Sequence, residues 1–111
     1  MPGTPQSYHL ADLLDYHEGQ IASRSLKKRF GTKLPVTLLA LAQGETISAE
    51  ESPLIKIIQV LEGQLEVTSE TDSWLLNAGD CLPLPVNYRH SLKAVTNCKI
   101  LQTENEPTIK E

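Results

Sequence analysis

One histidine and a polar stretch upstream of it carry the side chains that could do chemistry in this sequence. His90 offers an imidazole, which can hydrogen-bond a ligand or move a proton near neutral pH. Tyr88 precedes it in a loop and is expected to line the same site. Glu50, Ser52 and Lys56 add a carboxylate, a hydroxyl and an ammonium group in "GETISAEESPLIKIIQVLEG". These five residues are the predicted ligand-binding residues, and their types and spacing assign no catalytic role.

The elements that must position these residues are β-strands. From residue 34 onward, β-rich segments alternate with polar or glycine-containing turns at intervals of about 10 residues, which indicates an antiparallel sandwich or barrel. Pro83 and Pro85 cannot donate to a ladder, so their strand is expected to lie at an edge or to end there. The expected strands cover residues 35–42, 54–61, 64–69, 73–77, 81–85, 90–95 and 99–103.

The N-terminal third is less regular. Leu10, Leu13 and Leu14 have the spacing of a short helical turn, with Ser7 as its N-cap and Gly19 as its stop. Residues 20–28 alternate like a strand, although residues 23–30 would also suit a helical turn. We expect one domain over residues 1–111 with a core of about 20–103 and flexible termini, including a frayed tail from residue 104.

Composition and charge narrow the classes of function. The chain has 111 residues, 40% apolar and 22% charged, which suits a single soluble domain. Its net charge of -4 gives no basic excess for phosphates, so we expect no nucleic-acid partner. We expect no membrane partner and a cytoplasmic location, because no signal peptide or spanning segment is visible. Cys81 and Cys98 are expected to be free, buried thiols in a reducing compartment.

Two segments match the motifs of a known family. "NAGDCLPLPVNYRHSLKAV" resembles the second motif of the cupins, with Gly79, Asp80, Pro85 and His90 at the motif positions. "IIQVLEGQLEV" is similar to the end of their first motif, through Gly63. With the lead-in segments, the resemblance covers about residues 10–103 and identifies the chain as a small single-domain cupin. It implies an all-β fold, the double-stranded β-helix or jelly-roll barrel (RmlC-like), with a pocket at one mouth.

The resemblance also implies a metal site, and here the sequence departs from it. Metal-binding cupins use two histidines and a glutamate from the first motif and one histidine from the second. Glu50, Ser52 and Lys56 stand where the first three belong, and only His90 is retained. Because catalytic zinc takes three protein ligands and Lys56 would oppose a divalent ion, we expect no tightly bound metal. The alternative is a divalent metal held by His90 and Glu50.

Strand parity suggests what replaces the metal. Residues 56, 58 and 60 share one face, so Lys56 points into the mouth if Ile58 and Val60 line the core. We then expect a Glu50–Lys56 ion pair with His90 nearby. Alternatively, Pro53 shifts the register and Lys56 extends to solvent. A separate alternative for His90 is a ring that a backbone carbonyl satisfies and that has no role at the site.

Three interpretations of function remain open. The preferred one is a cupin barrel that binds an unknown small polar molecule in its mouth without a metal or other cofactor. The second is a cupin enzyme, either a metal-dependent oxygenase or isomerase with an altered ligand set or a metal-free enzyme using His90. The third is a ligand-sensing or dimerising accessory module. The resemblance also favours a homodimer.

Overall fold

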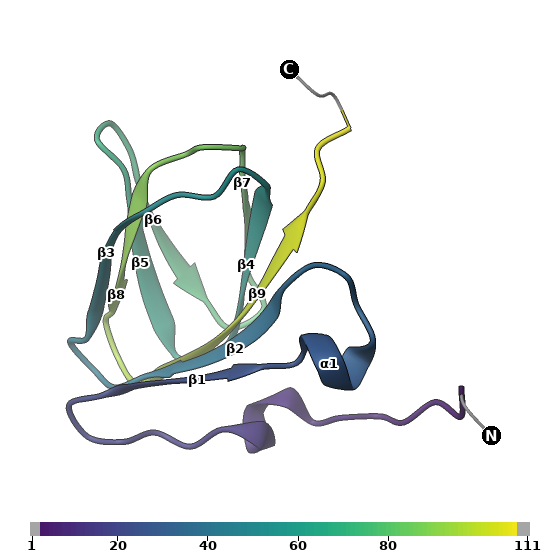
Figure 1. Ribbon diagram of the computed structural model, residues 1–111. Coiled ribbons are helices and arrows are strands. Elements are labelled where there is room, and N and C mark those ends of the chain that lie inside the picture. The colour runs from purple at the N-terminus through teal and green to yellow at the C-terminus, as the bar shows by residue number, and fades with distance from the viewer. Residues whose placement is uncertain (1–2, 109–111) are drawn as a thin grey trace.

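The computed structural model describes residues 3–108, and β-strands dominate this part of the chain (Figure 1). Residues 3–108 contain two short helices, the 3-10 helix η1 (Leu10–Leu13) and α1 (Lys27–Phe30). The strands are β1 (Ile21–Ser25), β2 (Val36–Leu41), β3 (Thr46–Glu50), β4 (Ile55–Glu62), β5 (Gln64–Thr68), β6 (Ser73–Asn77), β7 (Cys81–Leu84), β8 (His90–Ala94) and β9 (Cys98–Asn105).

The strands form two antiparallel sheets that face each other. One has the order β1-β2-β9-β4-β7 and the other the order β3-β8-β5-β6. Figure 1 shows them closing into a barrel, with the β3–β4 and β7–β8 connections together at its upper end. We call this end the mouth; the last residue of β3, the first residues of β4 and β8 and the end of β9 lie there. The fold is the expected all-β jelly-roll barrel.

Alternation along the strands builds two apolar layers. The interior of the barrel is lined by the inward faces of both sheets, with Ile58, Val60, Leu92 and Ile100 among its fully buried side chains. The outer face of the five-stranded sheet carries a second cluster around Leu38. The N-terminal segment runs beneath this face in Figure 1, and leucines of η1 pack against the cluster.

All seven strands expected from residue 34 onward are present, and β7 lies at a sheet edge, as its prolines indicate. Both interpretations of residues 20–30 hold in succession, because β1 ends at Ser25 and α1 follows. The helical turn at residue 10 is confirmed, but Ser7 is not its cap. His9 takes the cap position without a side-chain bond, and the turn ends at Leu13, before Gly19.

Two expectations about the strands are wrong. β3 was not expected, because only Ile47 and Glu50 of this polar edge strand are partly buried, so the apolar alternation is short. The tail does not fray from residue 104, because β9 pairs with β4 as far as Asn105. The expectations for residues 1–2 and 109–111 lie outside the described residues.

No helix of residues 3–108 is long and apolar enough to cross a membrane.

The two cysteines differ in burial, which corrects half of the expectation. Cys98 is buried in the barrel interior, and burial raises the pKa of its thiol to about 11. Cys81 is exposed, because it lies on an edge strand opposite the exposed Gln59.

This difference predicts selective reactivity of the thiols. In the native protein, Ellman's reagent is expected to modify Cys81 and to leave Cys98 unmodified, because the thiolate is the reactive form and Cys98 is inaccessible. In denaturant both thiols should react. Rapid modification of the native Cys81→Ser variant would contradict the burial of Cys98.

Candidate functional site

Strand β4 positions the side chain of Lys56 at the mouth. Ile58 and Val60 are fully buried inside the barrel, and residue 56 shares their face by alternation. The Lys56 side chain is only 12% exposed. It therefore turns inward rather than extending to solvent.

A β-bulge in β3 aims Glu50 at the same point. Ile47 lies opposite Leu92 of β8, so a regular antiparallel ladder would place Ala49 opposite His90. The register shifts by one residue, and Glu50 takes that place instead. Ala49 has a φ of 55°, and its N–H donates to the Ser91 hydroxyl at 2.9 Å. Bulges commonly re-aim a side chain in this way.

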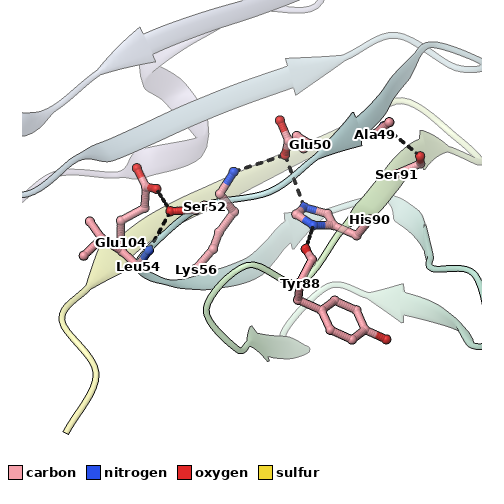
Figure 2. Close-up of polar contacts among 9 residues, drawn as sticks. All are labelled: Ala49, Glu50, Ser52, Leu54, Lys56, Tyr88, His90, Ser91 and Glu104. Carbon is pink, nitrogen blue, oxygen red and sulfur yellow. Dashed lines mark hydrogen bonds and ion pairs between the residues drawn. The ribbon is translucent and has the colours of Figure 1, made fainter. Parts of the chain in front are cut away.

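Two nitrogen-bearing groups converge on one carboxylate oxygen of Glu50, as Figure 2 shows. Lys56 Nζ lies 3.2 Å from Glu50 Oε1 and donates a hydrogen bond to it. His90 Nε2 lies 3.3 Å from the same oxygen. The ion pair that strand parity predicts is therefore present, with His90 beside it.

A backbone carbonyl orients the ring of His90. The ring is almost fully buried, and its Nδ1 lies 2.9 Å from the carbonyl oxygen of Tyr88. Because a carbonyl can only accept, Nδ1 carries the proton, and in a neutral ring Nε2 is then an acceptor. Nε2 faces Glu50 but makes no aligned hydrogen bond with any described residue.

The surroundings of Glu50 favour its ionised form. The neighbouring His90 ring, 3.3 Å away, is the main cause that lowers the pKa of Glu50, and the charge of Lys56 adds to it. Partial burial acts in the opposite direction without cancelling the effect. The carboxylate is thus held ionised by its two neighbours.

This lowered pKa predicts a pH dependence of stability. A carboxyl whose pKa is lower in the folded state stabilises the fold above its ordinary value of 4.5, and the contribution is lost as pH falls through the folded pKa. The difference in unfolding free energy between wild type and Glu50→Gln should therefore be largest near neutral pH and should shrink towards pH 3. Urea denaturation at both pH values measures it. Glu70→Gln, at an exposed turn, controls for the loss of one negative charge. An unchanged difference for Glu50→Gln between the two pH values would contradict the assignment.

Ser52 and Tyr88 have structural contacts in the mouth. The Ser52 hydroxyl donates to Glu104 of β9 and accepts from the N–H of Leu54, so it ties the β3–β4 connection to β9. The Tyr88 ring packs edge-on against Trp74, and Figure 2 shows it directed away from Glu50 and Lys56. A ligand-binding role for either residue stays a prediction.

A cavity of about 210 Å³ adjoins this end of the barrel. Of the five predicted site residues, only His90 lines it. The other lining residues come from β3, β5, β8 and the neighbouring loops: Ala49, Thr68, Ser69, Glu70, Arg89 and Ser91.

Two residues of β9 belong to the mouth but were not predicted as site residues. Glu104 lies opposite Lys56 in the β4–β9 ladder, and Gln102 lies opposite Ile58. Gln102 is buried, and its Nε2 has no hydrogen-bond partner among residues 3–108. Alternation from the apolar Ile100 could have placed both on the inner face, but the tail from residue 104 was expected to be frayed.

The residues at the mouth do not fit a tightly bound metal. No group of three or more His, Cys, Asp or Glu side chains that could hold an ion occurs within residues 3–108. Structural zinc sites use four protein ligands and catalytic sites three. Here His90 and Glu50 stand with the ammonium group of Lys56, which is already paired with the carboxylate.

The fold and its mouth place the protein in the class of small jelly-roll barrels. Several solved structures of cupins have the same fold. A cupin superfamily protein from Desulfitobacterium hafniense is 24% identical, with a TM-score of 0.84, and the match covers 95% of this chain and 94% of that one. A conserved protein of unknown function from Streptococcus pyogenes is 22% identical, with a TM-score of 0.82 over 96% and 92% of the two chains. An RmlC-like cupin from Desulfovibrio desulfuricans is 18% identical, with a TM-score of 0.75 over 92% and 97%.

The chain therefore has the fold of a small cupin domain, and at these identities the likeness concerns the fold alone. No protein-family model matches the sequence. No curated protein matches it either.

Proposed function

We propose that this cupin barrel binds a small polar molecule at its mouth and works without a tightly bound metal. One observation carries the proposal: the carboxylate oxygen nearest His90 is already paired with the ammonium group of Lys56 at 3.2 Å. Two like charges a few ångströms apart repel by several kcal/mol at reduced dielectric, on the order of 4 kcal/mol at 4 Å. A divalent cation would have to displace Lys56 and would then find few ligands.

A metal titration tests this proposal. The melting temperature of purified wild type should move by less than about 1 °C with EDTA or with excess Mn²⁺, Fe²⁺, Ni²⁺ or Zn²⁺, because a ligand stabilises only what it binds. His90→Ala is the matched control for binding at the mouth. A rise of several degrees in wild type that is lost in His90→Ala would overturn the proposal.

One contact favours the runner-up, a metal-dependent cupin enzyme with an altered ligand set. The bond from His90 Nδ1 to the Tyr88 carbonyl leaves Nε2 free, which is how metal-binding histidines are usually oriented. The same titration decides between the two functions. The ligand count and the position of Lys56 support the metal-independent one.

A role as a sensor or accessory module, in a cytoplasmic homodimer, extends the proposal. The free thiols of Cys81 and Cys98 are compatible with a reducing compartment. Strands β1 and β7 leave sheet edges open for pairing with a second copy. Size-exclusion chromatography with light scattering measures the molar mass of the protein in solution. The mass should be twice that of the 12.3 kDa chain.

A further inference from the structure

With the His90 ring neutral, two hydrogen-bond acceptors face each other at the mouth. Glu50 Oε1 and His90 Nε2 lie 3.3 Å apart, and Nε2 is an acceptor in the neutral ring because Nδ1 donates to Tyr88. In this neutral form of the ring, a donor placed between the two acceptors would serve both. The ring is nearly completely buried, and its Nε2 has no hydrogen-bond partner within residues 3–108.

Lys56 donates to only one of these two acceptors. Its ammonium group donates to Glu50 Oε1, and no hydrogen bond joins it to His90 among the described contacts. The group reaches Glu50 from the opposite sheet, at the end of a flexible four-carbon stem. Lys56 is therefore a built-in cation at a position where a better-placed donor could make both bonds.

The charge at the mouth also favours a cation. Glu104 lies opposite Lys56 on the same face of the five-stranded sheet, and its carboxylate accepts from Ser52. Two carboxylates against one ammonium leave a formal charge of −1 with His90 neutral. An anionic ligand would meet this excess, whereas a monovalent ammonium would balance it. A divalent metal ion finds too few ligands, but an ammonium needs only acceptors for its N–H groups.

We propose that the mouth binds the primary ammonium group of a small organic amine, and that Lys56 fills this position in the absence of ligand. The inference rests on the proposed function and names the chemical class of its ligand. Binding moves Lys56 towards solvent and brings the ligand nitrogen within reach of both Glu50 and His90.

Chemical rescue of Lys56→Ala tests the proposal. The substitution removes three carbons and the ammonium group, which is the composition of n-propylammonium. At a concentration several times its dissociation constant, n-propylammonium should raise the melting temperature of Lys56→Ala by about 5 °C. 1-Propanol and sodium propionate, matched in size, should each raise it by less than about 1 °C at the same concentration, because they lack the positive charge.

Two controls locate the binding. The Lys56→Ala/Glu50→Gln double variant should show no rescue, because it lacks the charged acceptor. In wild type, n-propylammonium should shift the NMR signals of the His90 ring. Its affinity should be at least about tenfold weaker than for Lys56→Ala, because the state that can bind the amine, with Lys56 displaced, is a minor one.

The NMR titration of wild type with n-propylammonium tests the inference even if Lys56→Ala fails to fold. No rescue of a folded Lys56→Ala, equal rescue by 1-propanol, or wild-type signals unaffected by the amine would overturn the inference. Those results would leave the metal-independent function standing, since the metal titration tests it separately.

Discussion

Gly63→Ala is expected to destabilise the fold by about 2–5 kcal/mol, the largest loss among the substitutions proposed for this chain. Gly63 has a φ of 79° in the tight turn between β4 and β5, a conformation that costs other residues about 1–2 kcal/mol. An added Cβ would also collide with the carbonyl oxygen of Asn97 and lie 2.8 Å from the Cα of Cys98. Both are backbone atoms, so the β8–β9 turn itself would have to move.

Gly44→Ala is the matched control. Gly44 also has a positive φ, 87°, but a Cβ added there meets no atom of residues 3–108 within 4 Å. Its loss should be limited to the backbone strain, about 1–2 kcal/mol. Urea denaturation measures the loss of unfolding free energy in both variants. The difference between the two losses gives the contribution of the steric collision at residue 63. Equal losses in the two would contradict the close approach at Gly63.

Lys56→Glu is expected to have the second-largest effect. It replaces the cation beside Glu50 with a third carboxylate at the mouth, and loss of a partly buried ion pair should cost about 2–4 kcal/mol in the absence of metal. With Glu50 and His90, the introduced carboxylate would complete three protein ligands, the number that a catalytic zinc site uses. We therefore expect Zn²⁺ or Mn²⁺ to recover most of the lost stability.

Lys56→Gln removes the charge without adding a carboxylate and serves as the control. It should bind the same metals at least about tenfold more weakly than Lys56→Glu, because a neutral amide oxygen attracts a divalent ion less strongly than a carboxylate does. Thermal denaturation with and without metal, followed by calorimetric titration, measures both variants. Failure of Lys56→Glu to gain any stability from metal, or an equal gain in Lys56→Gln, would contradict the account of the mouth.

Much of the barrel can be predicted because each strand and turn has a recognisable pattern within its own segment of the sequence. Alternating apolar residues and glycine turns mark the strands from residue 34 onward, and Pro83 marks an edge. The same parity rule places Lys56, one partner of the ion pair with Glu50, inside with Ile58. These features depend on neighbours in the chain, which is why a single sequence reveals them.

The parts that could not be predicted depend on distant pairing. Glu50 faces His90 only because a bulge at Ala49 shifts the register of β3, a strand too polar to be recognised by alternation. Gln102 and Glu104 enter the mouth because β9 keeps pairing with β4 to the end of the ladder. The bulge has no signature within its own segment, and alternation from Ile100 indicates the inner face for Gln102 and Glu104 but not how far the pairing continues.

The metal content of wild-type protein, purified without chelators, tests the central claim most directly. The claim is that the ammonium of Lys56 stands at the cation position beside Glu50 and His90. Elemental analysis should then find iron, nickel, manganese and zinc far below one ion per chain. One tightly held transition-metal ion per chain, absent from His90→Ala, would contradict the claim.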